Sequence, residues 1–350
     1  MLDSFLANRS LVRLLSFLVL ISAILTTTAC NGLFGTHKKV QIPQLLTPLS
    51  ESDKTQLLNE INRLAATRSL HGKVDIQFED TSFAEAGIAE KYRQADGTVT
   101  VQRPGKIYLV IQFAFVDIAQ MASDGEHFRV AILRGDEKYK RFVKGTNNAT
   151  YPKLDTDASG PDPKKKRQPG EQETVSALSN LRPQHLTDAL MIRPARNQDG
   201  FVYSLSEFFQ EEPDIRLQLQ AKGTRIVRGY YLLEEFSPVS AGEAKLSRRF
   251  WFDRVKGIRL ARLQTFNERG LLTTDVTYWD EKPFGEAGQM RLPSRIEITR
   301  PHDQYKLSIS YQTPAAVELD RDYRPEAFVL ENKWQLPEVD LDAHPGKSND

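Results

Sequence analysis

The sequence predicts a mainly β protein with one strongly curved antiparallel sheet, a half-barrel of about 11–13 strands. Segments with alternating apolar side chains and many β-branched or aromatic residues recur through most of the chain. The turns between them, such as 253–257 and 267–270, are short enough for hairpins, and strands do not alternate regularly with helices. Because so many strands in one sheet cannot stay flat, the sheet must curve or close.

The stretch 103–130 is expected to form the centre of this sheet. After Arg103-Pro104-Gly105, every second residue is apolar, so one face of a strand is directed at the core. The residues on that face are Ile107, Leu109, Ile111, Phe113 and Phe115. Ser123-Asp124-Gly125 then supplies the Asp-Gly pair of a tight hairpin, and Phe128 resumes the alternation. The stretch therefore predicts two strands and a turn.

The first 30 residues are expected to be a lipoprotein signal peptide. Arg9 and Arg13 precede the apolar run 14–25, which is shorter than the ~20 residues of a membrane-spanning helix. The single cysteine of the chain, Cys30, follows the small residue Ala29 at the end of this segment. We therefore expect Cys30 to be the acylated lipid anchor. The alternative is ordinary secretion with cleavage near Ala29, which would leave a free thiol.

The rest of the chain divides by composition into a tether, a domain and a tail. Residues 31–50 contain glycine and proline without periodicity and read as a flexible tether. The domain is expected to span 51–336 and to begin with an amphipathic helix capped by Ser52 or Asp53. Residues 337–350 read as a polar tail.

The domain is expected to contain a disordered insertion at about 146–172, because this segment is rich in proline, glycine and charge. Its basic run 164–167 either touches anionic lipid headgroups or is a solvated loop tip. A short helix is predicted at about 184–190, after Pro183. Further strands are predicted at 201–205, 215–219, 226–233, 246–252, 258–266, 271–279, 292–298 and 305–311.

The order Arg-Pro, apolar strand, Ser-Asp-Gly, apolar strand in 103–130 resembles the LolA/LolB-type lipoprotein carriers and receptors of the bacterial envelope. The resemblance extends from the helix near Thr55 to Phe128. It implies an open sheet wrapped around an apolar cavity, with helices over the concave face. It further implies that the five apolar residues from Ile107 to Phe115 line the cavity, and that Arg103 is a gate that hydrogen-bonds to the covering helices. From the residues alone, Arg103 is a solvated charge at a strand end, and the apolar face fills a solid core equally well.

Composition and motifs argue against catalysis and against nucleic-acid binding. Lys plus Arg number 47 and Asp plus Glu 46, so the chain has no bulk attraction for nucleic acid. The sequence contains no nucleophile elbow, phosphate loop, dinucleotide fingerprint or paired-histidine motif. The six histidines are scattered singly, and one cysteine excludes an internal disulfide. We therefore expect no enzymatic activity, no metal and no cofactor.

These observations together predict a lipid-anchored envelope protein that faces the periplasm, at the outer membrane, and binds lipid or lipoprotein acyl chains without covalent chemistry. Its partners would be the acyl chains, the membrane that holds its anchor and a possible envelope protein. The alternative is a structural lipoprotein with a solid interior, which binds a protein partner at an edge of its sheet by strand addition.

Overall fold

The structure is a computed structural model that describes residues 42–81, 90–91, 94–134, 137, 140–147, 149, 151, 181–196, 200–214, 225–240, 242–288 and 290–343. The chain divides into two compact units, Met1–Gln44 and Leu45–Asp350. The predicted signal peptide and Cys30 lie outside the described residues, as do most of the predicted insertion and the predicted strand 215–219. The fold below is that of the unit Leu45–Asp350.

A mainly antiparallel sheet dominates this unit, as predicted. It has 17 strands in the described part of the chain, of which four have only two or three residues. These four are β1 (Gln44–Leu45), β3 (Glu90–Lys91), β16 (Glu318–Leu319) and β17 (Glu338–Asp340). The 13 longer strands are β2 (Ser69–Asp80), β4 (Ala95–Gln102), β5 (Lys106–Phe113), β6 (Val116–Asp124), β7 (His127–Ile132), β8 (Arg141–Thr146), β9 (Val202–Pro213), β10 (Arg225–Ser240), β11 (Glu243–Asp253), β12 (Arg259–Phe266), β13 (Leu272–Phe284), β14 (Met290–Arg300) and β15 (Tyr305–Tyr311).

Neighbours in the sequence pair almost throughout. The longer strands follow the hydrogen-bonded order β9, β10, β11, β12, β13, β14, β15, β2, β4, β5, β6, β7, β8, and each pair is antiparallel. Strand β2 is the exception to the sequential rule, because it joins β15 near the end of the chain to β4 near its beginning. Strand β17 adds to β8 in parallel. Short turns thus set the order, as hairpin chemistry predicts.

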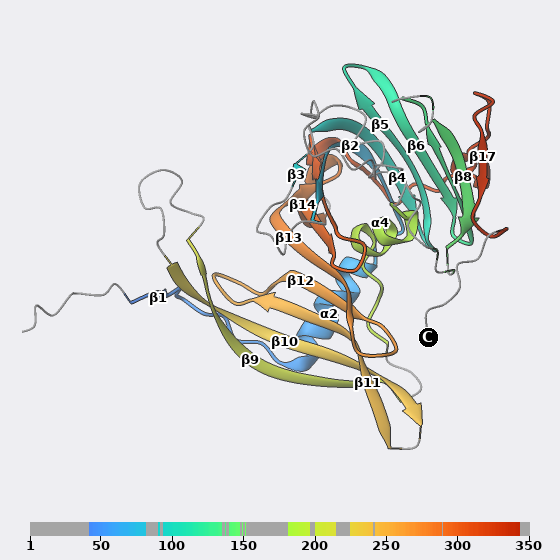
Figure 1. Ribbon diagram of the computed structural model, residues 1–350. Helices are drawn as coiled ribbons and strands as arrows, with labels where there is room; N and C mark the ends of the chain where they lie inside the picture. Colours follow the sequence, from blue (N-terminus) through green and yellow to red (C-terminus); the bar gives the residue numbers. More distant parts are fainter. Residues whose placement is uncertain are drawn as a thin grey trace, which may run out of the picture. The chain divides into compact units, whose positions relative to one another are not determined.

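Two α-helices of the described chain lie against the sheet: α2 (Lys54–Ala65) and α4 (Pro183–Leu190). Helix α4 contacts β5 and β6 as well as β14, although three strands separate β14 from β5 in the order of the sheet. A flat sheet would hold β5 and β14 about 20 Å apart, since neighbouring strands are ~4.8 Å apart. The sheet therefore curves around α4, and Figure 1 shows the helices on its inner side.

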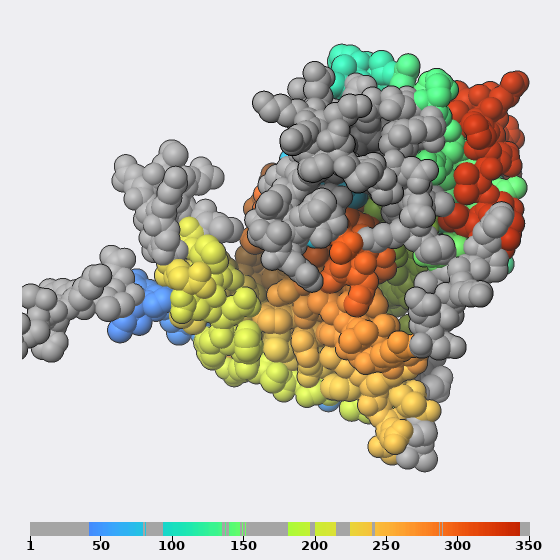
Figure 2. Space-filling model, in the orientation of Figure 1, coloured from blue at the N-terminus to red at the C-terminus, as the bar shows by residue number. Residues whose placement is uncertain are grey.

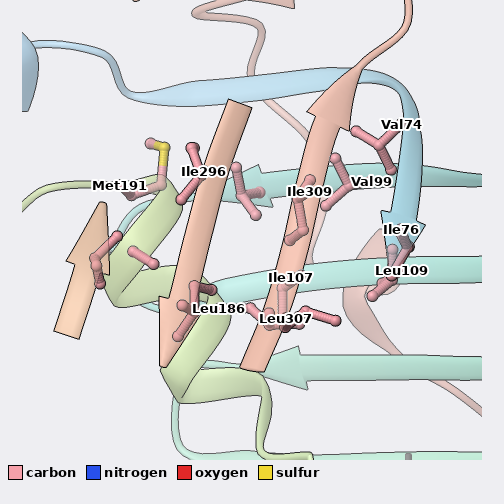
Figure 3. Close-up of a cluster of buried hydrophobic side chains, with 14 of the residues drawn as sticks. Val74, Ile76, Val99, Ile107, Leu109, Leu186, Met191, Ile296, Leu307 and Ile309 are labelled. Atoms are coloured by element: carbon pink, nitrogen blue, oxygen red, sulfur yellow. The ribbon is translucent and has the colours of Figure 1, made fainter. Parts of the chain in front are cut away.

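The main core lies between the inner face of the curved sheet and the two helices. Figure 3 shows part of it, with Leu186 of α4 among side chains from five strands. Alternate residues of many strands reach this core, for example Val74 and Ile76 in β2 and Leu307 and Ile309 in β15. Period-two alternation predicted this layer correctly in strands such as β4 and β15, where buried positions alternate with less buried ones. Strand β6 departs from the pattern, because its residues from Ile118 to Ser123 are all buried.

The central stretch contains one more strand than the sequence predicted. The apolar run ends at Phe113, and Ala114 and Phe115 form a two-residue turn to β6 in which both have positive φ, 48° and 65°. The prediction that Phe115 belongs to the buried face is therefore wrong: its side chain is 96% exposed. The expected Asp-Gly hairpin then follows between β6 and β7.

Two predicted boundaries also need correction. The predicted tether to residue 50 docks before its end, because the Leu46 amide donates to the Val227 carbonyl (2.9 Å) and the Ser50 amide donates to the Arg254 carbonyl (2.8 Å). The predicted polar tail begins later than 337, because 338–340 form β17 and Leu341 is buried. Figure 2 shows this end of the chain, in red, packed beside the green of β8.

Candidate functional site

Arg103 holds the ends of both helices against the sheet. Its Nε donates to the Thr67 carbonyl (2.9 Å), two residues beyond the end of α2. Its Nη1 and Nη2 donate to the carbonyls of Met191 (3.3 Å) and Ile192 (2.7 Å), which follow the last turn of α4. All three carbonyls lie one or two residues past the end of a helix, outside its own hydrogen-bond ladder. Burial, together with the charge of Arg193, lowers the pKa of Arg103.

The turn that carries Arg103 packs against the neighbouring hairpin turn. A Cβ atom on Gly125 would lie 2.7 Å from the Pro104 carbonyl oxygen, so only glycine fits there. Gly105 and Gly125 both have positive φ, 65° and 104°. The Arg-Pro-Gly and Asp-Gly motifs thus form one structural unit, and their joint presence orients the arginine.

Local sequence signals mark the start of both helices. Asp53 caps α2 in a capping box, in which its carboxylate accepts from the Gln56 amide (2.8 Å) and Gln56 accepts from the Asp53 amide (3.1 Å). Helix α4 has Pro183 in its first position, where the missing N–H costs nothing, and leaves helical geometry at Met191. The sequence predicted both helices.

The apolar residues of β5 lie on the inner face that the helices cover. Ile107, Leu109 and Ile111 are buried in the main core, and Phe113 packs against it half-buried. Phe115 is separate from them, at the hairpin tip. Leu186 of α4 belongs to the same cluster, so a ligand on this face of β5 would have to take the place of helix side chains.

The space between the helices and the sheet is nearly filled. A pocket there encloses about 20 Å³. Its lining comes from α2, α4 and the strands β2, β13, β14 and β15, and includes none of the five residues predicted as cavity lining. The lining residues are Leu64, Thr67, Leu70, Ala189, Leu190, Ile192, Tyr278, Phe284, Leu292, Pro293, Ile296 and Tyr311. A pocket of this volume has no room for an acyl chain.

Polar groups of the sheet fasten α4 as well. The hydroxyl of Tyr305 lies 2.8 Å from His185 Nδ1, and the hydroxyl of Tyr278 donates to the Ala189 carbonyl (3.1 Å). Burial, reinforced by the positive charge of Arg300, lowers the pKa of His185 to about 3, so the imidazole is neutral near pH 7. Burial raises the pKa of both tyrosines. Sequence reasoning missed these contacts, because each joins residues about 90 or more positions apart.

A larger pocket of about 300 Å³ has a different character. Charged and polar side chains of β2, β14 and β15 line it, among them Asp75, Glu297 and Lys306. Its lysine and glutamate already pair with each other at 2.9 Å. Such a lining does not suit an acyl chain.

Within the described ranges the chain lacks two further kinds of feature. None of the helices there is long and apolar enough to cross a membrane. Nor does any group of three or more His, Cys, Asp or Glu side chains in these ranges come together in a way that could hold a metal ion.

Comparison with known proteins gives similarity to solved structures only. No family model and no curated protein matches the chain. A LolA superfamily protein from Nitrosomonas europaea matches 80% of this chain and 99% of its own, with 12% identity and a TM-score of 0.40. A DUF1329 family protein from Desulfovibrio piger matches 78% and 95%, with 12% identity and a TM-score of 0.39. A putative outer membrane lipoprotein-sorting protein domain from Vibrio parahaemolyticus matches 78% and 94%, with 10% identity and a TM-score of 0.37.

The similarity is one of fold. Two of these three structures have names of the kind that the Arg-Pro and Asp-Gly stretch led us to expect. Because the identities are at most 12% and the TM-scores stay below 0.5, the matches carry no weight for what this chain binds.

Proposed function

We propose that this protein is a bacterial envelope lipoprotein that binds lipid or lipoprotein acyl chains between its sheet and the helices α2 and α4. Its role would be lipoprotein or lipid transport to the outer membrane, without covalent chemistry. The observation that carries the proposal is the position of Arg103, whose guanidinium bonds to the ends of both helices over an apolar sheet face. One side chain therefore bonds to both parts of the cover that α2 and α4 form over the sheet.

The described structure corresponds to the closed state in this proposal. An acyl-chain site needs roughly 300 Å³ or more, and the enclosed pocket has about 20 Å³. Ligand entry thus requires the cover to open, and α4 is the part that moves. The bonds that fasten α4 to Arg103, Tyr305 and Tyr278 permit such movement at a small net cost, because water can replace each of them when the helix lifts. Each methylene that then enters the apolar space contributes ~0.8 kcal/mol.

The proposal places the protein on a membrane by two features. The first is acylation of Cys30, expected from the signal sequence. The second is the tip of the β5–β6 hairpin, where Phe115 is 96% exposed beside the partly exposed Val116. A bulky residue at positive φ is costly, so an exposed phenylalanine there is not explained by folding. Contact of the tip with a lipid surface supplies a reason for it.

The test is binding of a fluorescent acyl-chain probe to the purified protein. We expect saturable binding, and we expect Arg103→Leu to increase the association rate because the closed state loses three hydrogen bonds. Arg129→Leu, the same chemical change on the outer face of β7, is the matched control and should leave the rate unchanged. Absence of probe binding by the unmutated protein would remove the carrier function. Identical association rates for Arg103→Leu and the unmutated protein would show that Arg103 does not control ligand entry.

A second candidate function has a specific observation in its favour. The nearly filled interior also fits a scaffold lipoprotein, and the edge strand β9 pairs within the described chain only with β10. A protein partner would then add a strand along β9. Native mass spectrometry of the protein isolated from a bacterial envelope separates the two, because a carrier retains lipid mass and a scaffold retains a polypeptide.

A further inference from the structure

A second arginine holds the chain just beyond α4. Arg248 in β11 donates from Nη1 to the Arg193 carbonyl (3.0 Å) and from Nη2 to the Pro194 carbonyl (2.9 Å). Arg103 holds the two preceding carbonyls, those of Met191 and Ile192. Four consecutive carbonyls after the helix are therefore bound by two guanidinium groups that come from distant strands of the sheet.

The two arginines differ in what holds them. Arg248 forms a buried pair with Glu235 in β10: Nε donates to Oε1 (2.8 Å), and Nη2 donates to Oε2. The pair is 8% and 1% exposed. Glu235 also accepts from the hydroxyls of Tyr203 (2.5 Å) and Ser247 (3.0 Å). Burial alone would raise the pKa of Glu235, but the bonds and charge of Arg248 together with the bonds from Tyr203 and Ser247 outweigh it, and the pKa is lowered. The pair with Glu235 thus fixes the position of Arg248 independently of its bonds to the chain after α4.

Arg103, in contrast, bonds in the described structure to three neutral carbonyls, and its neighbour Pro104 is exposed. Water can reach this guanidinium as soon as the helix ends move away. If the carbonyls of Arg193 and Pro194 moved away, two N–H groups of the buried Arg248 would lose their acceptors, which is the costlier event. The chain after α4 is therefore held weakly at Met191 and Ile192 and firmly at Arg193 and Pro194.

We propose that Arg248, oriented by Glu235, is the fixed anchor about which α4 swings when its end is released from Arg103. The inference rests on the proposed function, in which α4 is a cover that opens, and names the positioning residue for that movement. The chain bends between Met191, where helical geometry ends, and Pro194, whose φ is fixed by its ring. Beyond the anchor the chain is held to α2 and to β9, because the Ala195 amide donates to Asn62 Oδ1 (3.0 Å) and the Arg196 amide donates to the Tyr203 hydroxyl (2.7 Å). In this movement α2 stays in place and α4 alone swings.

Amide hydrogen exchange of the full chain without lipid tests the anchor, with three amides as reporters. The Met191 amide, bonded to the Thr187 carbonyl at 2.8 Å, reports on α4, and those of Ala195 and Arg196 report on the chain beyond it. In Arg103→Leu we expect exchange at Met191 to rise on the order of tenfold or more, with Ala195 and Arg196 unchanged. In Arg248→Met we expect all three to rise.

Two more variants keep the test independent of global unfolding. Glu235→Gln keeps the shape of the pair but removes its charge, and should speed exchange at Ala195 and Arg196 less than Arg248→Met does. Arg249→Met, which breaks the partly exposed pair with Glu234 in the same two strands, is the control and should change none of the three amides. Three results would each overturn the anchor: a joint rise of all three amides in Arg103→Leu, no rise at Met191 in that variant, or no change at Ala195 and Arg196 in Arg248→Met. The exchange experiment contains no lipid. A failure of probe binding therefore leaves the conclusion about the anchor unchanged, and a failed exchange prediction leaves the proposed lipid binding unchanged.

Discussion

Acidification should loosen α4 through His185, whose imidazole is buried against Tyr305. Its pKa falls from 6.5 to about 3 on folding, so between these values the unfolded chain binds a proton that the folded protein excludes. The stabilisation from the neutral imidazole is therefore fully present above pH 6.5 and is lost progressively as the pH falls toward 3. From pH 7.5 to 4.5 the loss amounts to ~3 kcal/mol, since only the two pH units below 6.5 contribute and each costs about 1.4 kcal/mol.

The groups that face His185 sharpen the expectation. Arg300 and Arg182 oppose protonation and Asp303 favours it, so burial and the two arginines together exceed the one carboxylate. We would measure the free energy of unfolding in urea by tryptophan fluorescence at each pH, for the unmutated protein and for His185→Gln. The variant should lose ~3 kcal/mol less over the same range, because glutamine does not titrate.

His127→Gln, which removes an exposed imidazole from β7, controls for the loss of a histidine as such. If His185→Gln and the unmutated protein show parallel pH dependence, His185 is not excluded from protonation in the folded state and the expected loss of stability has another origin. An imidazole resonance of His185 that titrates near 6.5 in the folded protein would contradict the expectation equally.

The other predictions concern the hairpin tip, the insertion and the lipid anchor. Phe115→Gly should stabilise the protein by ~1 kcal/mol in thermal unfolding, because glycine tolerates positive φ, and should weaken flotation with lipid vesicles; unchanged flotation would argue against membrane contact. Deletion of 153–170 should leave the melting midpoint nearly unchanged. Deletion of 147–170 should lower it, because this deletion also removes Tyr151, which packs at the edge of Phe128 and bonds to the Thr146 carbonyl. Equal midpoints for the two deletions would show that Tyr151 contributes nothing to stability. Cys30→Ser should release the protein from the membrane fraction, and a variant that still carries an extractable lipid anchor would contradict acylation of Cys30.

Local chemistry made much of the sheet predictable. Asp-Gly fixed the β6–β7 hairpin because the pair accepts the backbone that a tight turn requires. The β5–β6 turn was missed for the same reason. Its residues, Ala114 and Phe115, lack any turn signal, so the alternation was read straight through them. Strand β17 was missed because its three residues carry no sequence signal for pairing with β8, nearly 200 positions earlier.

The candidate site was predictable only in part. The residues of β5 were found because their period of two is visible in the sequence, and the resemblance drew attention to Arg103. The contacts that fasten α4 and the chain after it were not found, since His185 meets Tyr305 and Arg248 meets the Arg193 carbonyl only after the sheet has curved. A histidine in the middle of an amphipathic helix, and a Glu and Arg in neighbouring strands, are common on solvated faces and carry no local signal of burial.

The pairing of β2 with β15 has a consequence for how this protein reaches its native state. Residues 74–80 bond to residues 305–311, so the sheet joins its two halves across more than 220 positions of chain. Closing so long a loop costs entropy before any contact repays it, and folding through such pairings is slow. Until Tyr305 is available, residues 74–80 of β2 lack their partner on one edge. A chain of this kind remains open to chaperones for a long time, and truncation before residue 305 would expose β2 as a template for aggregation.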